Sequence, residues 1–314
     1  MPILGIDIGG TRLKAGLVDE NGNVVRKNAV RTPANLEGVK ATVASVVQQL
    51  TADGDVPTAI GVGCKGIIDT RTATVVTQPG TFKFLEGVKL SDLVANAFKV
   101  APPVFADNDA RAALAGEIVW GAARGRRQVI MLTLGTGVGG AVLVDGKILH
   151  GASGAAGLLG HITIAPRGRF CDCGNRGCLE TIFSARAIEA EALHAIHRGC
   201  ESLLTERFKE NLGGLDCKAI FDAAAEGDVV ARTIRDEAIE SLGAAIAGLL
   251  HAFDPEVVII GGQIVEAGAT LLDPLSHELR VRTQRLIGRT VPLVLPELKD
   301  SSGIVGAAAL TVLG

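Results

Sequence analysis

The chain has 314 residues, of which 47% are hydrophobic and 21% charged, and its formal net charge is −3. This composition is typical of a folded globular protein, and the length exceeds the size at which a single core usually stops growing, so two lobes are expected. The slightly negative charge, the lack of a basic stripe and the absence of tyrosine argue against nucleic acid as a partner.

No membrane segment is expected. The uncharged run of residues 128–144 is interrupted by four glycines, so it does not predict a membrane span. Only Met1 and Pro2 precede the first apolar run, without a basic and apolar leader, and we therefore expect a cytoplasmic protein.

The first part of the chain predicts an antiparallel arrangement of three strands followed by alternating strands and helices. The turn signal Glu20-Asn21-Gly22-Asn23 joins the second strand to the third. Apolar residues at helical spacing predict a helix over residues 36–50. The expected strands are 3–8, 15–19, 24–30, 58–63, 73–77 and 103–106, and the expected helices are 36–50, 89–98 and 108–120.

The pattern of strand, glycine turn and strand begins again at residue 128. The expected strands of this part are 128–134, 141–145, 147–149, 256–260 and 291–295, and the expected helices are 184–197, 201–211, 217–225, 228–252 and 301–313. The repetition predicts two similar α/β halves with the glycine turns on the two walls of a cleft. We place a small lobe at 1–120, with the C-terminal helix, about 300–314, packing back on it, and a large lobe at 121–299.

A histidine and three cysteines lie close together in the segment 161–180. One imidazole (His161) and three thiolates (Cys171, Cys173, Cys178) complete a tetrahedral zinc shell, and four protein ligands are typical of a structural zinc site. Without a leader segment a disulfide is less favoured, and the abundance of Gly, Arg and Asp argues against buried thiols. We therefore predict a structural Zn²⁺ that holds the flanking His161 and Glu180. The remaining cysteines, Cys64, Cys200 and Cys217, have no obvious mates and are expected to serve packing.

The turn Asp7-Ile8-Gly9-Gly10-Thr11 has the properties of a phosphate-binding loop. Its glycines let backbone N–H groups approach oxyanions, while Thr11 adds a hydroxyl donor and Lys14 a positive charge. Asp7, at the end of a buried strand, would be costly as an anion unless it held a cation such as Mg²⁺ through water. The alternative, an ordinary hairpin with a turn aspartate, remains open.

The second glycine turn, residues 135–140, reads GTGVGG and matches the spacing of a dinucleotide-binding loop. That spacing indicates a dinucleotide site only where the loop opens a helix, and here the strand-like sequence AVLVD follows. A dehydrogenase would instead require a helix over 141–150. We interpret the two Gly/Thr hairpins as binding opposite sides of one polyphosphate.

A candidate general base lies where an expected strand ends and a helix begins, at Asn108-Asp109. A carboxylate there can accept the proton of an alcohol that attacks a γ-phosphate. The alternative is that Asn or Asp only caps the helix, as such residues commonly do. The sequence does not separate Asp107 from Asp109 in this role.

Five segments taken together, DIGGTRLKAGLVD, ADNDARAALAGE, LTLGTGVGGAVLVDG, GAAGLLGH and CDCGNRGCLE, resemble the ROK family of sugar kinases over nearly the whole chain. The resemblance implies the two-lobed actin-like ATPase (ribonuclease H-like) fold. It implies ATP- and Mg²⁺-dependent phosphorylation of a hexose or hexose derivative, at the 6-hydroxyl, and a homodimer or higher homo-oligomer. The alternative is a non-catalytic sugar-binding sensor of the same fold. Family members that repress transcription carry an N-terminal helix-turn-helix, and the two residues before the first strand favour the enzyme.

The resemblance also implies roles for individual residues. The catalytic base would be Asp109, and the sugar would contact Asn108, Gly66, His161 and Glu180, with His161 using one ring nitrogen for zinc and the other for the sugar. The groups that bind ATP and its phosphates would be Asp7, Gly9, Gly10, Thr11, Lys14, Thr133, Gly135, Thr136, Gly137, Gly261 and Gly262.

Three positions depart from the family's sugar site. Leu158 stands where the family has the glutamate of Gly-Glu-x-Gly-His, Lys65-Gly66 replaces Pro-Gly, and Gly80-Thr81 replaces Asn-Leu. Because a lost polar partner weakens discrimination, we hypothesise an altered sugar. Lys65 would then meet an anionic or oxidised substituent and Leu158 an acyl or deoxy position. The alternative is that glucose remains a substrate.

Overall fold

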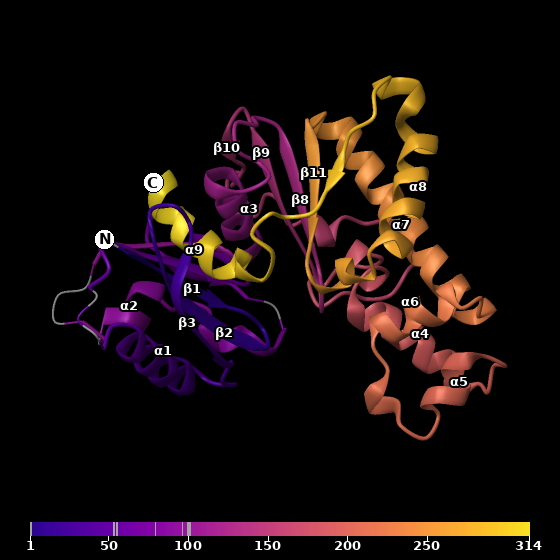
Figure 1. Cartoon of the computed structure of the whole chain (residues 1–314), viewed down its shortest axis with the longest axis horizontal. Coiled ribbons are helices and arrows are strands. Elements are labelled where there is room, and N and C mark those ends of the chain that lie inside the picture. Colours follow the sequence, from indigo (N-terminus) through magenta and orange to yellow (C-terminus); the bar gives the residue numbers. More distant parts are fainter. Residues whose placement is uncertain (1, 53, 55, 79, 96, 99–101) are drawn as a thin grey trace. The chain divides into compact units, whose positions relative to one another are not determined.

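The computed structural model describes residues 2–52, 54, 56–78, 80–95, 97–98 and 102–314 (Figure 1). The side chain of Thr81, one of the departures named above, lies outside this description. The chain forms two compact units: the first comprises residues 1–127, 141–157 and 296–314, and the second comprises residues 128–140 and 158–295. The chain therefore passes from one unit to the other after residues 127, 140, 157 and 295.

A five-stranded mixed sheet forms the centre of the first unit, in the order β3-β2-β1-β4-β7. Its strands are β1 (Ile3–Ile8), β2 (Arg12–Val18), β3 (Val24–Arg31), β4 (Ile60–Cys64) and β7 (Val104–Asn108). The first three strands pair antiparallel, as predicted, whereas β1, β4 and β7 run parallel. Because parallel strands end at the same edge of a sheet, the last residues of β1, β4 and β7 lie side by side.

Helices cover both faces of this sheet. Leu4, Ile6 and Ile8 share a core with the buried face of α1 (Leu36–Leu50), whose first turn is capped by the Asn35 side chain. The other face packs against α9 (Ser302–Leu313), which contacts β1 and β4 and also α3 (Asp109–Trp120). A Cβ at Gly5 or Gly61 would collide with backbone carbonyls of α9, so these glycines permit the close approach of helix and sheet.

Smaller elements complete the first unit. They are the two-stranded sheet of β5 (Ile67–Asp69) and β6 (Thr74–Thr77), a 3-10 helix over Gly80–Leu85, the short helix α2 (Leu90–Ala95) and a 3-10 helix over Lys299–Ser301.

The second sheet repeats the motif of a strand, glycine turn and strand, in the order β10-β9-β8-β11-β12. Its strands are β8 (Val129–Leu134), β9 (Val138–Val144), β10 (Lys147–Ile148), β11 (Val257–Gly261) and β12 (Leu293–Val294). The predicted turn over 135–140 is too long, because Gly139 and Gly140 already belong to β9. A Cβ at Gly140 would collide with the Leu159 side chain, so this glycine serves packing rather than the turn. A strand over 141–144 also excludes the dehydrogenase.

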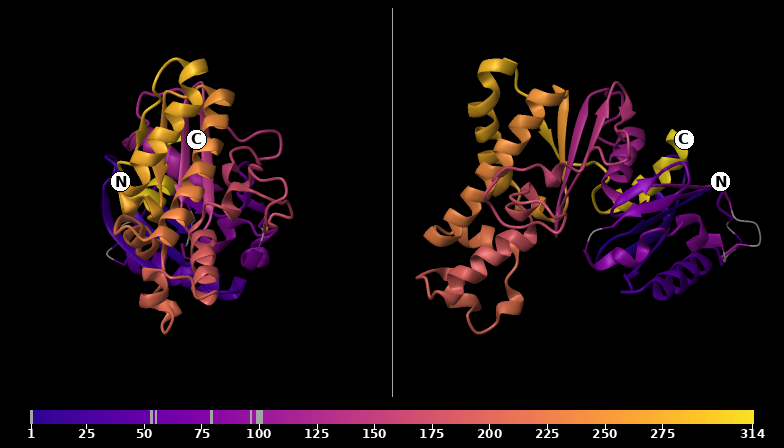
Figure 2. Two further views of the ribbon diagram at one scale, coloured as in Figure 1. Left: turned by 90° about the vertical axis from the view of Figure 1, so that its right-hand side faces the viewer. Right: turned by 180° about the vertical axis from the view of Figure 1, so that it is seen from behind.

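Helices α4 (Ala185–His197), α5 (Leu203–Phe208), α6 (Cys217–Ala225), α7 (Val229–Phe253) and α8 (Ala269–Ile287) make up much of the second unit. α7 packs against α4, α6 and α8, and the two long helices α7 and α8 lie side by side (Figures 1 and 2). The sequence did not predict α8. Short 3-10 helices lie at Leu159–His161, Leu179–Thr181, Leu212–Gly214 and Gln263–Ala267. In the part of the chain that the structure describes, no helix has the length and apolar character needed to cross a membrane.

Candidate functional site

Polar side chains gather in the first unit where β1, β4 and β7 end and α3 begins. Asp7 lies beside Gly63 in the register of β1 and β4, and Gly63 lies beside Asp107 in the register of β4 and β7. Asn108 is the last residue of β7 and Asp109 is the first of α3. Carboxyl ends of parallel strands are common ligand sites, because loops and helix N-termini meet there.

Asn108 is the N-cap of α3, so the capping alternative holds for this residue. Its Oδ1 accepts hydrogen bonds from the N–H groups of Ala110, at 2.9 Å, and Arg111, at 3.3 Å. Its Nδ2 donates to the carbonyl of Gly66 at 3.0 Å. Gly66 has a φ of 105°, and a Cβ there would collide with Gln78. Asn108 and Gly66, both predicted to contact the sugar, are therefore hydrogen-bonded to each other.

Asp107 and Asp109 have different surroundings, which the sequence alone did not reveal. Asp107 is buried and lies within ion-pair distance of Arg111, at 2.7 Å, and His150, at 2.8 Å. Asp109 is half-buried, and its carboxylate accepts only the N–H of Ala110, at 3.0 Å, with no ion pair among the described residues. Burial raises the pKa of Asp109, although this hydrogen bond and the nearby Lys65 partly oppose the rise. A carboxylate without a fixed partner and with a raised pKa can accept a proton.

The Asp7 carboxyl shares this electrostatic environment. Burial and then the charge of Asp109 raise the pKa of Asp7 to about 7, against the opposing effect of Lys14, which lies across the β1–β2 pair. The same burial and the two carboxylates raise the pKa of the intervening Cys64 thiol. The edge therefore concentrates negative charge that a cation would stabilise.

The turn between β1 and β2 exposes backbone N–H groups. The Gly9 N–H donates to Arg12 at 3.1 Å, and Thr32 fixes the turn by donating its hydroxyl to the Gly9 carbonyl at 2.8 Å. Gly10 and Thr11 are exposed, and no hydrogen bond from their N–H groups occurs within the described part of the chain. Free N–H groups in a glycine turn form a common binding site for an oxyanion.

The turn at residues 135–137 is held by the beginning of α4 in the second unit. Its carbonyls accept hydrogen bonds from Ala185 N–H, at 2.8 Å to Gly135, and from Arg186 Nε, at 3.1 Å to Thr136. Because the carbonyls are occupied, they do not present negative ends to a phosphate. Sequence reasoning missed Arg186, which follows the expected start of α4 by two residues and carries no motif.

Thr133, Gly261 and Gly262 come together at the ends of β8 and β11. Thr133 pairs with Gly261 in the parallel register. Gly262 has a φ of 95°, and a Cβ on it would collide with the backbone of Leu134. A glycine is therefore required at residue 262.

His161, Cys171, Cys173 and Cys178 are brought together as predicted, with all four potential ligand atoms within 4.8 Å of one another. Cys173 Sγ and Cys178 Sγ are 3.7 Å apart, and Cys171 Sγ lies 3.5 Å from His161 Nδ1. A tetrahedron with zinc–sulfur bonds of about 2.3 Å has edges of about 3.8 Å, so these separations fit a zinc ion. Burial and then the neighbouring thiols raise the pKa of Cys178 to about 12, a cost that a bound cation would remove.

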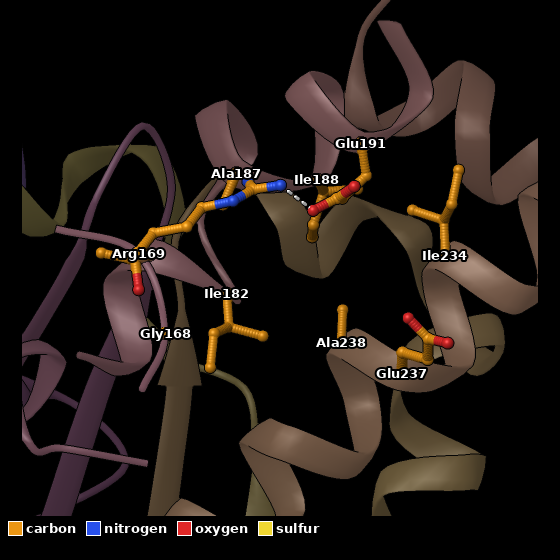
Figure 3. Close-up of a pocket in the computed structure, with 10 residues that line it drawn as sticks. Gly168, Arg169, Ile182, Ala187, Ile188, Glu191, Ile234, Glu237 and Ala238 are labelled. Atoms are coloured by element: carbon orange, nitrogen blue, oxygen red, sulfur yellow. Dashed lines mark hydrogen bonds and ion pairs between the residues drawn. The ribbon is translucent and has the colours of Figure 1, made fainter. Parts of the chain in front are cut away.

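A pocket of about 150 Å³ adjoins the metal-ligand loop but contains none of the predicted site residues (Figure 3). Ile182, Ile188 and Ile234 form its apolar wall, and the ion pair between Arg169 and Glu191 crosses its rim. Arg169, the cation of this lining, is paired with Glu191, and Glu237 adds a second carboxylate, which disfavours a phosphate.

Comparisons with a protein family, with related sequences and with solved structures agree with one another. A model of the ROK family matches residues 3–312. A glucokinase from Thermotoga maritima is 36% identical over 312 residues, which cover 99% of this chain and 97% of that protein. The crystal structure of a ROK family glucokinase from Streptomyces griseus in complex with glucose and AMPPNP superposes with a TM-score of 0.83, at 34% identity and 100% coverage of both chains. A ROK hexokinase from Thermus thermophilus gives a TM-score of 0.82, at 31% identity, with 100% and 98% coverage.

Proposed function

The chain belongs to the ROK family, and we propose that it transfers the γ-phosphoryl group of ATP to the 6-hydroxyl of a hexose or hexose derivative. It is an ATP-dependent sugar kinase with the actin-like ATPase fold. The observation that carries the mechanism is the contrast between two aspartates: Asp107 is held in ion pairs, whereas Asp109 has none among the described residues.

Asp109 acts as the general base. As the sugar hydroxyl oxygen bonds to the γ-phosphorus, its proton passes to the Asp109 carboxylate and the bond between the γ-phosphorus and the departing ADP oxygen breaks. The raised pKa of Asp109 supports this role, since a more basic carboxylate accepts the proton more readily.

Each unit carries polar groups that we propose as sugar contacts. In the first unit these are Asn108 and Gly66, which already share a hydrogen bond. In the second unit they are His161 and Glu180. His161 turns Nδ1 toward Cys171, which leaves Nε2 for a sugar hydroxyl.

We assign the phosphates of ATP to the two glycine turns, where the N–H groups of Gly10 and Thr11 have no acceptor among the described residues and those of Gly9 and Gly135 bond within their own turns. The first turn contributes Gly9, Gly10, Thr11 and Lys14, and the second contributes Thr133, Gly135, Thr136 and Gly137, with Gly261 and Gly262 on the adenosine side. Asp7 fits a Mg²⁺ site because its carboxylate is partly buried beside another carboxylate. The ion would supply positive charge to the phosphate oxygens.

Zinc is the metal proposed for His161, Cys171, Cys173 and Cys178, because one imidazole and three thiolates form a closed structural shell. Bound there, zinc would act indirectly, by holding His161 and the loop that leads to Glu180. By resemblance we also propose a homodimer or higher oligomer, which sedimentation equilibrium would test.

The sugar is proposed to differ from glucose at the position that Leu158 meets. Leu158 is half-buried, and its side chain forms no hydrogen bond at the start of the following 3-10 helix. Lys65 lowers the pKa of Asp109, which places its positive charge near the proposed base and favours a sugar with an anionic or oxidised substituent.

A coupled assay of ADP release tests this function over a panel of hexoses, amino sugars, N-acetyl sugars and uronic acids. We expect turnover with at least one sugar and a loss of about 1,000-fold in kcat in Asp109→Asn, since general base catalysis contributes 10²–10⁴-fold. Asp222→Asn, at an exposed residue that pairs with Lys218, is the control and should retain wild-type kcat. Sugar binding without turnover across the panel would contradict the kinase and support a sensor.

A further inference from the structure

Asp107, Arg111 and His150 form a network of charged and polar groups at the beginning of α3. One oxygen of Asp107 accepts from Arg111 Nε at 2.7 Å, and the other lies 2.8 Å from His150 Nε2. Asp107 is 2% and Arg111 1% exposed, whereas the His150 side chain is 39% exposed. His150 therefore lies at the edge of the network and the other two lie inside it.

The network connects two backbone segments of the first unit. Asp107 Oδ1 accepts the N–H of Asn108 at 2.7 Å, next to the proposed base. Arg111 Nη1 donates to the carbonyls of Gly154 and Ala156, both at 3.0 Å. These carbonyls belong to the loop 150–157, which closes on itself through the Ala156 N–H and the His150 carbonyl at 3.0 Å. Leu158, at which the chain enters the second unit again, follows this loop directly.

Stability alone does not account for a charged residue at position 111. Buried ion pairs can often be replaced by apolar side chains of similar volume without loss of stability. Arg111 Nη2 is buried and has no hydrogen-bond partner among the described residues, which adds a cost. The rigid fork of the guanidinium instead provides fixed directions: Nε points to Asp107 and Nη1 to the loop. The arrangement is therefore suited to holding Asp107 and the loop 150–157 in fixed positions relative to each other.

We propose that Asp107, Arg111 and His150 are positioning residues for phosphoryl transfer. They fix the Asn108–Asp109 segment relative to the loop 150–157, so that the proposed base and the neighbouring sugar contact Asn108 keep their places. The inference rests on the proposed role of Asp109. A misplaced group about 1 Å from its productive position can cost about 100-fold in rate.

Arg111→Met tests the proposal, because methionine fills much of the buried volume and removes all three hydrogen bonds. We expect kcat to fall about 100-fold and the KM for the sugar to rise. The KM for ATP should stay unchanged, since the residues proposed to bind the phosphates of ATP form no hydrogen bond with the described residues of the network. Arg207→Met is the matched control: Arg207 forms an exposed ion pair with Glu226 in the second unit and should leave both constants unchanged.

His150 provides a second test that does not depend on replacing a buried charge. His150→Gln keeps an N–H that can donate to Asp107, whereas His150→Leu does not. We expect the glutamine variant to retain most of kcat and the leucine variant to lose it. Both proteins should give the wild-type circular dichroism spectrum.

The outcomes separate this inference from the proposed function. Wild-type kcat and sugar KM in Arg111→Met and His150→Leu would overturn the positioning role while leaving the kinase intact. Equal losses in His150→Gln and His150→Leu, or a KM for ATP that rises as much as that for the sugar, would also overturn it. A wild-type protein that phosphorylates no sugar, with Asp109→Asn indistinguishable from it, would reject the proposed function and this inference together.

Discussion

The carboxylate of Glu180 accepts a hydrogen bond from the backbone N–H of Val138, with 2.8 Å between the nitrogen and Oε2. The bond joins the segment just after Cys178 to the first residue of β9, which follows the glycine turn at 135–137. A Cβ at Gly137 would occupy the place of this carboxylate, so the glycine makes the approach possible. One oxygen of Glu180 is therefore committed to the turn, and Oε1 remains for a ligand, with Arg186 4.0 Å away.

This geometry predicts a graded response to substitution of Glu180. In Glu180→Gln the amide oxygen can still accept the Val138 N–H, so the fold should persist while the charged acceptor for the sugar is lost. We expect kcat/KM for the sugar to fall about 10- to 100-fold, since hydrogen bonds to charged groups contribute about 1.5–3 kcal/mol. Glu180→Ala should lower the melting temperature as well, because it also frees the N–H. Exposed Glu210→Gln is the control, and an unchanged sugar KM in Glu180→Ala would contradict the assignment.

The raised pKa of Asp7 predicts a dependence of stability on pH. The folded chain holds the Asp7 proton up to about pH 7, whereas the unfolded chain releases it near the ordinary value of 3.8. The folded state therefore binds more protons between these values, and its stability falls as the pH rises through this window. Asp7→Asn removes the cost of ionising this carboxyl in the folded state. The free energy of unfolding of the variant minus that of wild type should therefore increase by at most about 4 kcal/mol from pH 4 to pH 8.

Urea unfolding at both pH values, without Mg²⁺ or nucleotide, measures this difference. Asp19→Asn is a useful comparison: hydrogen bonds with the Asn23 side chain and then its backbone hold the pKa of Asp19 below its ordinary value of 3.8, so its titration lies below that of Asp7 and its difference from wild type should barely change between pH 4 and pH 8. A difference between Asp7→Asn and wild type that stays the same at pH 4 and pH 8 would show that Asp7 is ionised throughout.

Loss of the metal should affect the sugar more than ATP. Cys178→Ser removes a buried ligand, and we expect zinc content to fall below one ion per chain, the melting temperature to decrease and the sugar KM to rise about 10-fold or more. Cys200→Ser, outside the cluster, should keep both zinc and activity. Zinc content is measured by atomic emission. A zinc-free Cys178→Ser protein with the wild-type sugar KM would show that the metal does not orient His161 and Glu180.

The sequence was informative where structure is determined locally. The hairpin of β2 and β3 follows from the turn residues 20–23, and the α3 N-terminus from Asn108, whose side chain caps the helix within its own first turn. The histidine and three cysteines of the predicted zinc site lie within one short segment, and the structure brings all four together. Conversely, α8 was missed because Pro274 and several charged residues obscure the apolar spacing of Leu271, Leu275 and Leu279.

Long-range contacts explain the rest of what sequence reasoning missed. His150 lies 43 residues from Asp107 along the chain, and the loop carbonyls lie 43 and 45 residues from Arg111. No periodicity or motif connects positions so far apart. The difference between Asp107 and Asp109 depends on these contacts, which is why the sequence could not assign different roles to two aspartates separated by a single residue. Residues 141–157 likewise group with the first unit although they follow the second glycine turn.

The final prediction concerns the residue that departs from the family's sugar site. The Leu158 carbonyl accepts a hydrogen bond from the His161 N–H at 3.0 Å, so its backbone is fixed while its half-buried side chain makes no hydrogen bond at the cap. Leu158→Glu should therefore keep the local fold and add a charged acceptor beside His161. We expect kcat/KM for glucose to rise about 10-fold or more, in line with a hydrogen bond from a hydroxyl to a charged group.

The same variant should lose activity toward the sugar that wild type prefers, because an acyl or deoxy position would now face a carboxylate without a partner. Leu158→Met keeps the apolar character and serves as the matched control, with the wild-type order of sugars expected. The measurement is kcat/KM over the same panel for the three proteins. If the order of sugars in Leu158→Glu matches that of wild type, specificity is determined elsewhere, and Lys65, whose charge acts on Asp109, becomes the next residue to replace.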